Sequence, residues 1–353
     1  MRFSYKLFSV FNIDLELHIL FILFILFLFL LNPIHALLLI EVFIFVTLHE
    51  IAHSLTARKY KVKVKKILLL PIGGIALMDI QNLKPKQEIV VSLAGPVLNF
   101  VFVLLGLFIA ASFNLEIPTL EDLFSKEIPL LHLFLFYSIY ANLILGVFNL
   151  FLPAFPLDGG RILRAVLALK FDILKATQYA RMISMLASIF LLIIAFFSGN
   201  FWLLFIAFFI ILSANSELGA IKLQYILKSV PASAITSRII ITVDPDESVY
   251  SAVQKLFAFG AFSGIAINKK IKVFELKSLS SLDKSKWKSA KVKKFLKTVP
   301  PVKASDTSQK VFEIMQKHDV DTVPVVEENK ILGVATKDNI ELYLRFREIL
   351  GGG

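Results

Sequence analysis

Long apolar runs, separated by short charged stretches, make up the first 225 or so residues of the chain. A helix that crosses a bilayer needs about 20 predominantly apolar residues, and these runs approach or exceed that length. We therefore predict six membrane-spanning helices, at residues 15–32, 37–57, 88–113, 130–152, 178–198 and 201–222. No convincing small-residue cleavage site follows the first run, so we expect it to be a retained span and not a signal peptide.

One apolar stretch, "ILLLPIGGIALMD" at 67–79, is too short to cross a membrane. Its centre, from Pro71 to Gly74, is a turn signal between two short runs of β propensity, and it predicts a β-hairpin. We expect this hairpin to dip into the protein at the cytoplasmic side, because such backbone is tolerated at membrane depth only where protein or a cavity covers it. A short surface hairpin is the alternative.

From about residue 232 the pattern changes to that of a soluble domain with an internal repeat. Residues 244–267 can be laid over residues 303–326: each segment has a helix start, an amphipathic helix and then a run of β propensity. Another predicted strand follows each segment. We therefore expect an α/β domain over residues 232–350, with halves at 232–284 and 293–350 joined by a lysine-rich linker.

The composition agrees with a membrane part followed by a soluble part. Hydrophobic residues make up 57% of the chain and charged residues 18%, against about 45–50% and about 25% in ordinary soluble domains. The net charge of +11 comes from dispersed lysines without interleaved aromatic residues. This arrangement favours solvated faces and cytoplasmic loops over nucleic-acid binding. The chain has no cysteine, so any metal site must use His, Asp or Glu.

The charges of the loops predict how the chain is oriented in the membrane. Basic residues follow the second predicted span, in "RKYKVKVKK", and the fourth, between 161 and 181, whereas the loop at 114–127 is acidic. Basic loops tend to stay in the cytoplasm. We therefore expect a multi-pass protein of the cell membrane, with both termini and the soluble domain in the cytoplasm.

Three ionisable residues interrupt the second predicted span. His49, Glu50 and His53 form the pattern H-E-x-x-H, which on a helix places both imidazoles on one face while the glutamate can reach a water between them. This is the arrangement of a zinc ion with two histidine ligands and a glutamate base. An ion pathway or proton relay is the alternative, and a merely structural pair is disfavoured because polar groups are costly within a membrane.

A third ligand is expected because catalytic zinc sites usually have three protein ligands. The fourth predicted span ends in "FNLFLPAFPLDGGR", where Pro153 and Pro156 break the helix before Asp158. The break lets Asp158 turn back toward the second span, at a similar depth to His49. Asp158 is therefore the candidate third ligand, and an ordinary aspartate in a loop after a helix is the alternative.

"HEIAH", "SLAGPVLNF" at 92–100 and "NLFLPAFPLDGG" together resemble the site-2 protease family of intramembrane zinc metalloproteases. The resemblance implies that His49, His53 and Asp158 bind zinc and that Glu50 is the catalytic base. It also implies a role for Asn149 in binding substrate or the oxyanion, although three residues separate Asn149 from Pro153 where two are expected. The predicted hairpin fits the family's substrate-binding edge, where an unwound substrate adds as a strand.

The repeat at the C-terminus resembles a pair of CBS domains, which one branch of that family carries. "ILGVATKDNI" at 331–340 provides Thr336 and Asp338 at positions where nucleotide-binding members contact ribose. The resemblance thus implies a site for one adenine nucleotide, ATP or AMP. A ligand-free dimerisation or docking module is the alternative, and association into a homo-oligomer through these domains is expected in either case.

The function expected from the sequence is hydrolysis of peptide bonds within or beside transmembrane segments of membrane proteins. The expected partners are a transmembrane protein substrate and the lipid bilayer, with no nucleic acid. The alternative is a CBS-regulated ion channel or transporter. A transporter would be expected to show repeated halves with charged or broken helices near the bilayer midplane, and no such repeat is visible among the six predicted spans.

Overall fold

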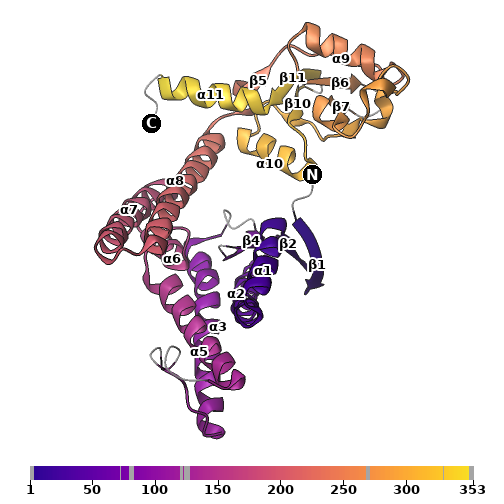
Figure 1. The fold of residues 1–353 in the computed structure, drawn as a ribbon. Helices are drawn as coiled ribbons and strands as arrows, with labels where there is room; N and C mark the ends of the chain where they lie inside the picture. Colours follow the sequence, from indigo (N-terminus) through magenta and orange to yellow (C-terminus); the bar gives the residue numbers. More distant parts are fainter. Residues whose placement is uncertain are drawn as a thin grey trace. The chain divides into compact units, whose positions relative to one another are not determined.

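The computed structural model describes residues 4–71, 73–78, 83–119, 122, 128–267, 271–328 and 330–349. The chain divides into two compact units, residues 1–221 and 222–353 (Figure 1). Part of the predicted acidic loop at 114–127, and Ile72 and Asp79 of the predicted hairpin, lie outside the described residues.

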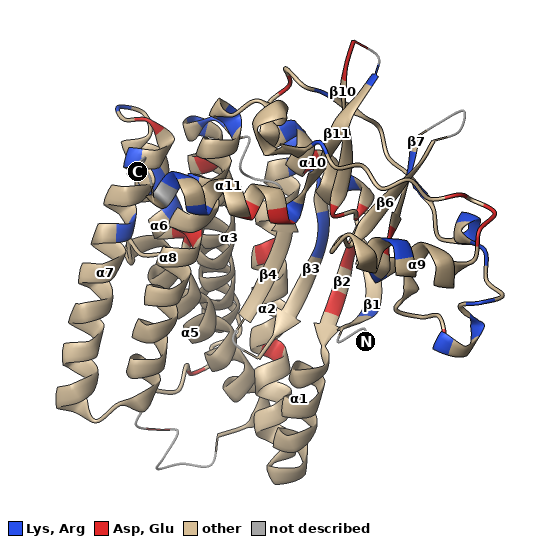
Figure 2. Ribbon diagram, turned by 90° about the horizontal axis from the view of Figure 1, so that it is seen from above, with Lys and Arg blue, Asp and Glu red and all other residues tan. Residues whose placement is uncertain are grey.

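Unit 1 is mainly helical. Its helices are α1 (Ile19–Leu31), α2 (Pro33–Lys59), α3 (Pro85–Ser112), α5 (Leu130–Phe151), α6 (Asp158–Leu167), α7 (Ile173–Ser198) and α8 (Phe201–Ser229), the last of which ends in unit 2. Among the described residues, five helices are long and apolar enough to cross a membrane: α2, α3, α5, α7 and α8. Their middle stretches carry few charges, and α5 carries none (Figure 2).

The first predicted span differs from what the structure contains. Residues 13–18 are strand β2, and the apolar helix that follows, α1, has only 13 residues. The polar side chains of Asp14, Glu16 and His18 alternate with apolar ones, which is the period of a strand. His18 then begins the helix, because its Nδ1 accepts a hydrogen bond from the backbone N–H of Leu20.

A four-stranded sheet accompanies the helices of unit 1. Its strands are β1 (Ser4–Val10), β2 (Ile13–His18), β3 (Val64–Leu70) and β4 (Gly73–Met78), in that order across the sheet. β2 and β3 are parallel, whereas the other two pairs are antiparallel. The antiparallel pair β3–β4 lies in the stretch where the sequence predicts a hairpin, but the sequence analysis did not predict β1 or β2.

The sheet packs one face against α1 and α2. Ile13, Leu15, Ile67 and Leu69 are buried there with Phe21 and Phe43. β4 is an outer strand and is paired only with β3 among the described residues. One edge of the sheet is therefore left without a partner strand, next to α2.

Unit 2 is an α/β domain that contains the repeat expected from the sequence. Helix α9 (Val249–Ala258) precedes the antiparallel strands β6 (Ser263–Ile267) and β7 (Ile271–Glu275), and α10 (Ser308–His318) precedes the antiparallel strands β10 (Thr322–Glu327) and β11 (Lys330–Thr336). The remaining elements are β5 (Thr236–Ser237), β8 (Lys297–Thr298), β9 (Val302–Lys303), α11 (Lys337–Ile349) and the 3-10 helices η2 (Ala232–Ile235), η3 (Leu276–Leu279), η4 (Lys284–Lys286) and η5 (Val292–Lys294).

Each half of unit 2 adds a short strand to the sheet of the other half: β5, from the first half, pairs with β11, and β8, from the second half, pairs with β7. The strand orders are β6-β7-β8 and β5-β11-β10-β9. One apolar core lies in the half with α9, around Phe274 and Leu256, and a second lies in the half with α10, around Val323 and Met315. The end of α8 packs Ile226 and Leu227 into the second core.

Candidate metal centre

Helix α2 places His49 and His53 side by side. They are four residues apart, so both imidazoles lie on one face of the helix, and their Nε2 atoms are 2.9 Å apart. Both residues are 6% exposed. The pair therefore forms one half of a buried site whose other half must come from elsewhere in the chain.

Asp158, the first residue of α6, completes the site. Its Oδ2 lies 3.2 Å from Nε2 of His49 and 3.2 Å from Nε2 of His53, and the residue is 8% exposed. The chain turns sharply between α5 and α6 and packs closely on itself. A Cβ at Gly159 would lie 2.5 Å from the carbonyl oxygen of Leu152, so the turn that carries Asp158 requires glycine there.

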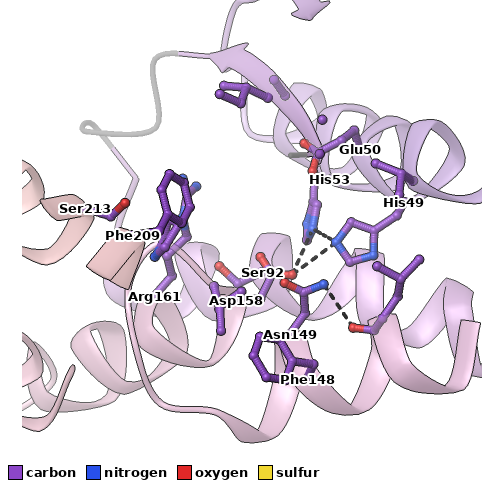
Figure 3. Close-up of a pocket in the computed structure, with 18 of the residues that line it drawn as sticks. His49, Glu50, His53, Ser92, Phe148, Asn149, Asp158, Arg161, Phe209 and Ser213 are labelled. Carbon is purple, nitrogen blue, oxygen red and sulfur yellow. Dashed lines mark hydrogen bonds and ion pairs between the residues drawn. The ribbon is translucent and has the colours of Figure 1, made fainter. Parts of the chain in front are cut away.

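The two imidazoles face the site with the same nitrogen. Nδ1 of His49 is hydrogen-bonded to Oδ1 of Asn99, and Nδ1 of His53 is bonded to the backbone carbonyl of Val91 at 2.7 Å. Both partners are acceptors, so each Nδ1 carries the proton and each Nε2 presents a lone pair. Two lone pairs and one carboxylate oxygen thus converge at one point (Figure 3).

This donor set fits a zinc ion. His49, His53 and Asp158, called the ligand trio below, offer only acceptors to one another, and Oδ2 of Asp158 has no hydrogen-bond partner among the described residues. Ligands held tetrahedrally at 2.0–2.1 Å from zinc are separated by about 3.3 Å. The separations of 2.9–3.2 Å in the trio are close to that value.

Glu50 projects from the same turn of α2 into a cavity of about 640 Å³ that the ligand trio also lines (Figure 3). A Cβ at Gly74 of β4 would lie 2.9 Å from Cγ of Glu50, so strand and helix approach each other closely at this point. The cavity is bounded by α2, α3, α5, α6, α8 and the residues 73–76 and 78 of β4. The candidate base, the candidate ligands and the outer strand of the sheet thus share one space.

Asn149 of α5 also lines this cavity (Figure 3). Its Nδ2 donates to the carbonyl oxygen of Leu145 at 2.9 Å, one turn back on the same helix. Within the described part of the chain, no hydrogen bond joins it to the ligand trio. One N–H of its amide is left for another acceptor.

Several residues at the site have no role assigned by the sequence analysis. Asn99, which is 1% exposed, accepts the hydrogen bond from His49, and its own Nδ2 donates to Oδ1 of Asn142 at 2.7 Å. Asn99 stands within "SLAGPVLNF", but the partner of a side chain in that motif cannot be read from the motif. Asn142 stands in the mainly apolar fourth predicted span, and its polarity there is the signal that could have pointed to it.

A second cavity, of about 540 Å³, lies within unit 2. Thr336 and Asp338, the two candidate nucleotide contacts, both line it. The hydroxyl of Thr336 donates to Oδ1 of Asn339 at 2.8 Å and accepts from the backbone N–H of Asn339. Thr336 therefore caps the start of α11.

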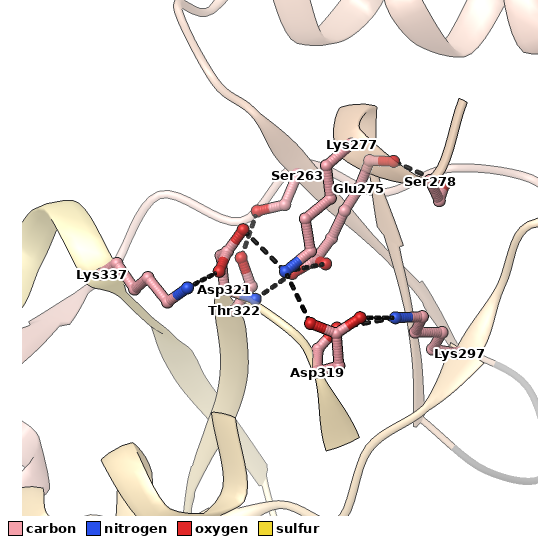
Figure 4. A network of polar contacts seen from close by, with 9 residues as sticks. All are labelled: Ser263, Glu275, Lys277, Ser278, Lys297, Asp319, Asp321, Thr322 and Lys337. Atoms are coloured by element: carbon pink, nitrogen blue, oxygen red, sulfur yellow. Dashed lines mark hydrogen bonds and ion pairs between the residues drawn. The ribbon is translucent and has the colours of Figure 1, made fainter. Parts of the chain in front are cut away.

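A polar network borders the second cavity and joins the two halves of unit 2 (Figure 4). Asp321 forms ion pairs with Lys277, at 2.8 Å, and with Lys337. Glu275 accepts the backbone N–H of Asp321 at 2.6 Å and is 4% exposed. Burial raises the pKa of Glu275 above its ordinary value, although the N–H of Asp321 and the ammonium of Lys277 oppose this.

Comparison with known proteins gives matches for both units. The sequence matches Peptidase family M50 over residues 37–196 and the CBS domain over residues 292–345. It is 34% identical to a zinc metalloprotease of Methanocaldococcus jannaschii over 346 residues, which are 96% of this chain and 96% of that protein. It is 30% identical to stage IV sporulation protein FB of Bacillus subtilis over 130 residues, 36% of this chain and 40% of that protein.

Among solved structures, a site-2 protease from Methanocaldococcus jannaschii is similar to this chain. The sequences are 38% identical, the match covers 61% of this chain and 95% of the other, and the TM-score is 0.46.

Proposed function

The chain belongs to the M50 peptidase family, the zinc metalloproteases of the site-2 type, and on that premise we propose that the ligand trio in unit 1 holds the catalytic zinc ion. One observation carries the proposal: two imidazole lone pairs and a buried carboxylate oxygen, from two helices far apart in sequence, converge within 3.2 Å. The channel or transporter alternative has no support in the comparisons, which name zinc metalloproteases.

Glu50 is the proposed general base. It extends from α2 into the cavity beside the trio, where it can take a proton from the attacking water and later pass it to the leaving amine. A zinc ion bound by the trio supplies Lewis-acid chemistry, which lowers the pKa of water toward about 7 and polarises a carbonyl. The remaining N–H of Asn149, which lines the same cavity, is the proposed donor to the oxyanion that develops at the scissile carbonyl.

The proposed substrate is an extended segment of a membrane-spanning protein, seated along β4. The unpaired edge of β4 offers backbone N–H and C=O groups to an added strand, and the same strand lines the cavity with Glu50. A helical substrate hides its scissile carbonyl in a hydrogen bond to the residue four positions on. The substrate must therefore unwind locally before it can bind in this way.

The proposed topology has six spans, with residues 1–225 as the protease domain and 232–350 as the cytoplasmic CBS pair. The first of these spans combines α1 with β2, because α1 is apolar throughout but too short to cross alone. The basic loops after the second and fourth spans support a cytoplasmic location for both termini.

Unit 2 is proposed to bind one adenine nucleotide. Support comes from the cavity that Thr336 and Asp338 line, and from Lys277 and Lys337 at the same cavity, since ammonium groups bind phosphate. Calorimetric titration of the solubilised full-length protein with ATP and AMP tests this proposal. Saturable binding that Asp338→Ala weakens supports it, and no heat of binding with either nucleotide contradicts it in favour of a docking or homo-oligomerisation module.

The catalytic assignment is tested by Glu50→Gln. The glutamine has the size of the glutamate but cannot accept the proton, so we expect purified E50Q to keep its zinc and to lose cleavage of a membrane-embedded test substrate. The wild-type protein should lose the same activity when a chelator removes the metal. Full activity of E50Q would refute the role of Glu50.

A further inference from the structure

A series of buried polar side chains leads from His49 away from the cavity. Nδ1 of His49 donates to Oδ1 of Asn99 on α3, and Nδ2 of Asn99 donates to Oδ1 of Asn142 on α5, at 2.7 Å. Asn99 is 1% exposed and Asn142 is fully buried. In apolar helices such groups are costly unless they are hydrogen-bonded, so their presence calls for an explanation.

The series continues through Ser138 and returns to α2. Nδ2 of Asn142 donates to the backbone carbonyl of Ser138 at 2.7 Å, and the hydroxyl of Ser138 donates to Oε1 of Glu41 at 2.5 Å. Glu41 lies eight residues before His49 on α2, about 12 Å along the helix axis. The polar series thus connects two points on α2 by way of α3 and α5.

The metal site sets the direction of the bonds from His49 as far as the backbone carbonyl of Ser138, and the carboxylate of Glu41 sets the direction of the bond from the Ser138 hydroxyl. Because Nε2 of His49 must present its lone pair to a metal, Nδ1 must donate. Asn99 must then accept with its oxygen and donate with its nitrogen, and Asn142 must do the same. The last donor, the hydroxyl of Ser138, ends at the carboxyl of Glu41, which can act as a pure acceptor.

The other histidine of the trio is held in a different way. Nδ1 of His53 donates to the backbone carbonyl of Val91, an acceptor that every residue type would supply. Among the described residues, Nδ1 of His49 is held by a side chain from another helix, whereas Nδ1 of His53 is held by the backbone. A change in the polar series should therefore affect one ligand and leave the other in place.

We propose that Asn99, Asn142 and Glu41 are positioning residues that hold His49 in the tautomer and orientation needed to bind zinc. The proposal rests on the zinc-binding role assigned to the trio above. It gives a reason for a carboxylate in α2 at a position remote from the cavity: Glu41 fixes the Ser138 hydroxyl, and with it the turn of α5 that receives Asn142. Hydrogen-bond partners of this kind typically change metal affinity by about 10–100-fold when they are removed.

The test measures zinc affinity of the full-length solubilised protein by competition with a chromophoric chelator. Asn142→Leu removes both bonds of Asn142, and we expect zinc binding to weaken by about 10–100-fold. Glu41→Leu removes the last acceptor and should give a smaller, several-fold weakening. Glu41→Gln keeps an acceptor oxygen at the same place and should restore affinity close to that of the wild type.

Thr47→Val is the matched control, because Thr47 lies on α2 between Glu41 and His49 and its hydroxyl donates to the carbonyl of Phe43 in its own helix. We expect it to leave zinc affinity unchanged. The visible spectrum of the cobalt(II)-loaded protein adds a readout of ligand geometry, which should change in Asn142→Leu but not in the control. A loss of stability alone would lower the unfolding temperature without changing that spectrum.

Zinc binding by His49→Ala distinguishes a failure of the positioning role from a failure of the zinc site itself. If His49→Ala does not reduce zinc binding, the trio itself is wrong. If His49→Ala abolishes binding while Asn142→Leu and Glu41→Leu both bind zinc as tightly as the control, only the positioning role is overturned. Should Asn142→Leu fail to fold, the comparison of Glu41→Leu with Glu41→Gln decides, since leucine is well tolerated in apolar helices.

Discussion

Gly95 of α3 lies directly against His49 of α2. A methyl group on Gly95 would stand 2.6 Å from Nε2 of His49, and nearer still to Nε2 of His53. The absence of a side chain at Gly95 therefore leaves open the space in which a metal would contact the two imidazoles. Helix α3 therefore contributes to the site in two ways: Gly95 leaves space beside the imidazoles, and Asn99 accepts the hydrogen bond from His49.

Gly95→Ala should abolish metal binding, because its methyl group would displace the imidazoles or occupy the space between them. We expect the zinc content of the purified variant to fall to a small fraction of one ion per chain, with a parallel loss of proteolysis. Gly219→Ala on α8 is the control, since a Cβ there meets no atom of the described residues within 4 Å. Full zinc content in Gly95→Ala would mean that the metal lies elsewhere.

Asp158→Asn should also lose zinc, although asparagine has nearly the same shape. The substitution removes the negative charge that compensates a divalent cation, and a neutral amide is a far poorer ligand in a buried site. We expect chelator competition to show a loss of affinity of at least about 100-fold. Asp172→Asn, an exposed N-cap of α7 that bonds the backbone N–H of Lys175, should bind zinc as the wild type does.

Arg164 should be essential for the stability of unit 1. It lies on α6, is 4% exposed, and pairs with the buried Glu88 of α3, where its Nε is 3.1 Å from Oε1, and with Glu217 of α8. Arg164→Leu leaves Glu88 without a counter-ion, which typically costs about 3–5 kcal/mol. Thermal unfolding of the solubilised protein measures this loss.

Two further variants check the cause of the effect of Arg164→Leu. Adding Glu88→Leu should recover part of the lost stability, because the buried charge is then gone. Arg181→Leu, which breaks the bond to Asn215 between α7 and α8, should cost only about 1 kcal/mol. Equal losses for Arg164→Leu and Arg181→Leu would contradict the special role of the buried pair.

The stability of unit 2 should decrease as the pH rises above 4.5. Burial raises the pKa of Glu275 above 4.5 in the folded protein, so the folded state binds more protons than the unfolded state between 4.5 and the raised pKa. In that window stability falls with increasing pH. Burial also acts to raise the pKa of Asp321, but hydrogen bonds from Lys277 and Lys337 outweigh this effect and lower that pKa below 3.8. The contribution of Asp321 to the stability of unit 2 is therefore lost only at a more acidic pH.

Glu275→Gln should remove the decrease in the stability of unit 2 that is expected above pH 4.5. The chain has two tryptophans, Trp202 and Trp287, so the fluorescence of Trp287 in a Trp202→Phe background reports on unit 2 alone. Denaturant unfolding across the pH range should show a flatter profile for Glu275→Gln, whereas the exposed Glu313→Gln should keep the original slope. An unchanged slope in Glu275→Gln would show that another group titrates there.

Local spacing explains why much of the candidate site was predicted from sequence. His49 and His53 are four residues apart on a helix that the apolar pattern already requires, so their neighbourhood follows from helix geometry alone. Asp158 follows two prolines that favour an end to α5, whereas the direction in which the chain then continues depends on the packing of α6 against other helices such as α3. The five long helices follow in a similar way, because each contains an apolar stretch long enough to cross a membrane.

The first apolar run shows where such reasoning fails. Residues 13–18 have a period of two that was overlooked beside the longer apolar run after them, and their pairing with β1 and β3 depends on residues 4–10 and 64–70. A strand is stable only with partners, and the partners of β2 include a segment almost fifty residues away. The apolar pattern alone therefore extended the helix too far toward the N-terminus.

The sequence by itself determined the long apolar helices, the change of composition near residue 232 and the placement of His49 and His53 on one helix face, because each depends on the pattern within one segment. The approach of Asp158 to this pair depends on the packing of a second helix, α6, so the sequence could only propose it. Only the tertiary structure decided that Asn99 and Val91 accept from the two histidines, that Gly95 leaves room between them, and that β4 lines the same cavity as Glu50. These relationships depend on how far each helix is rotated and shifted against its neighbours. That packing is set by the side chains of several segments together, so no single stretch of sequence contains it.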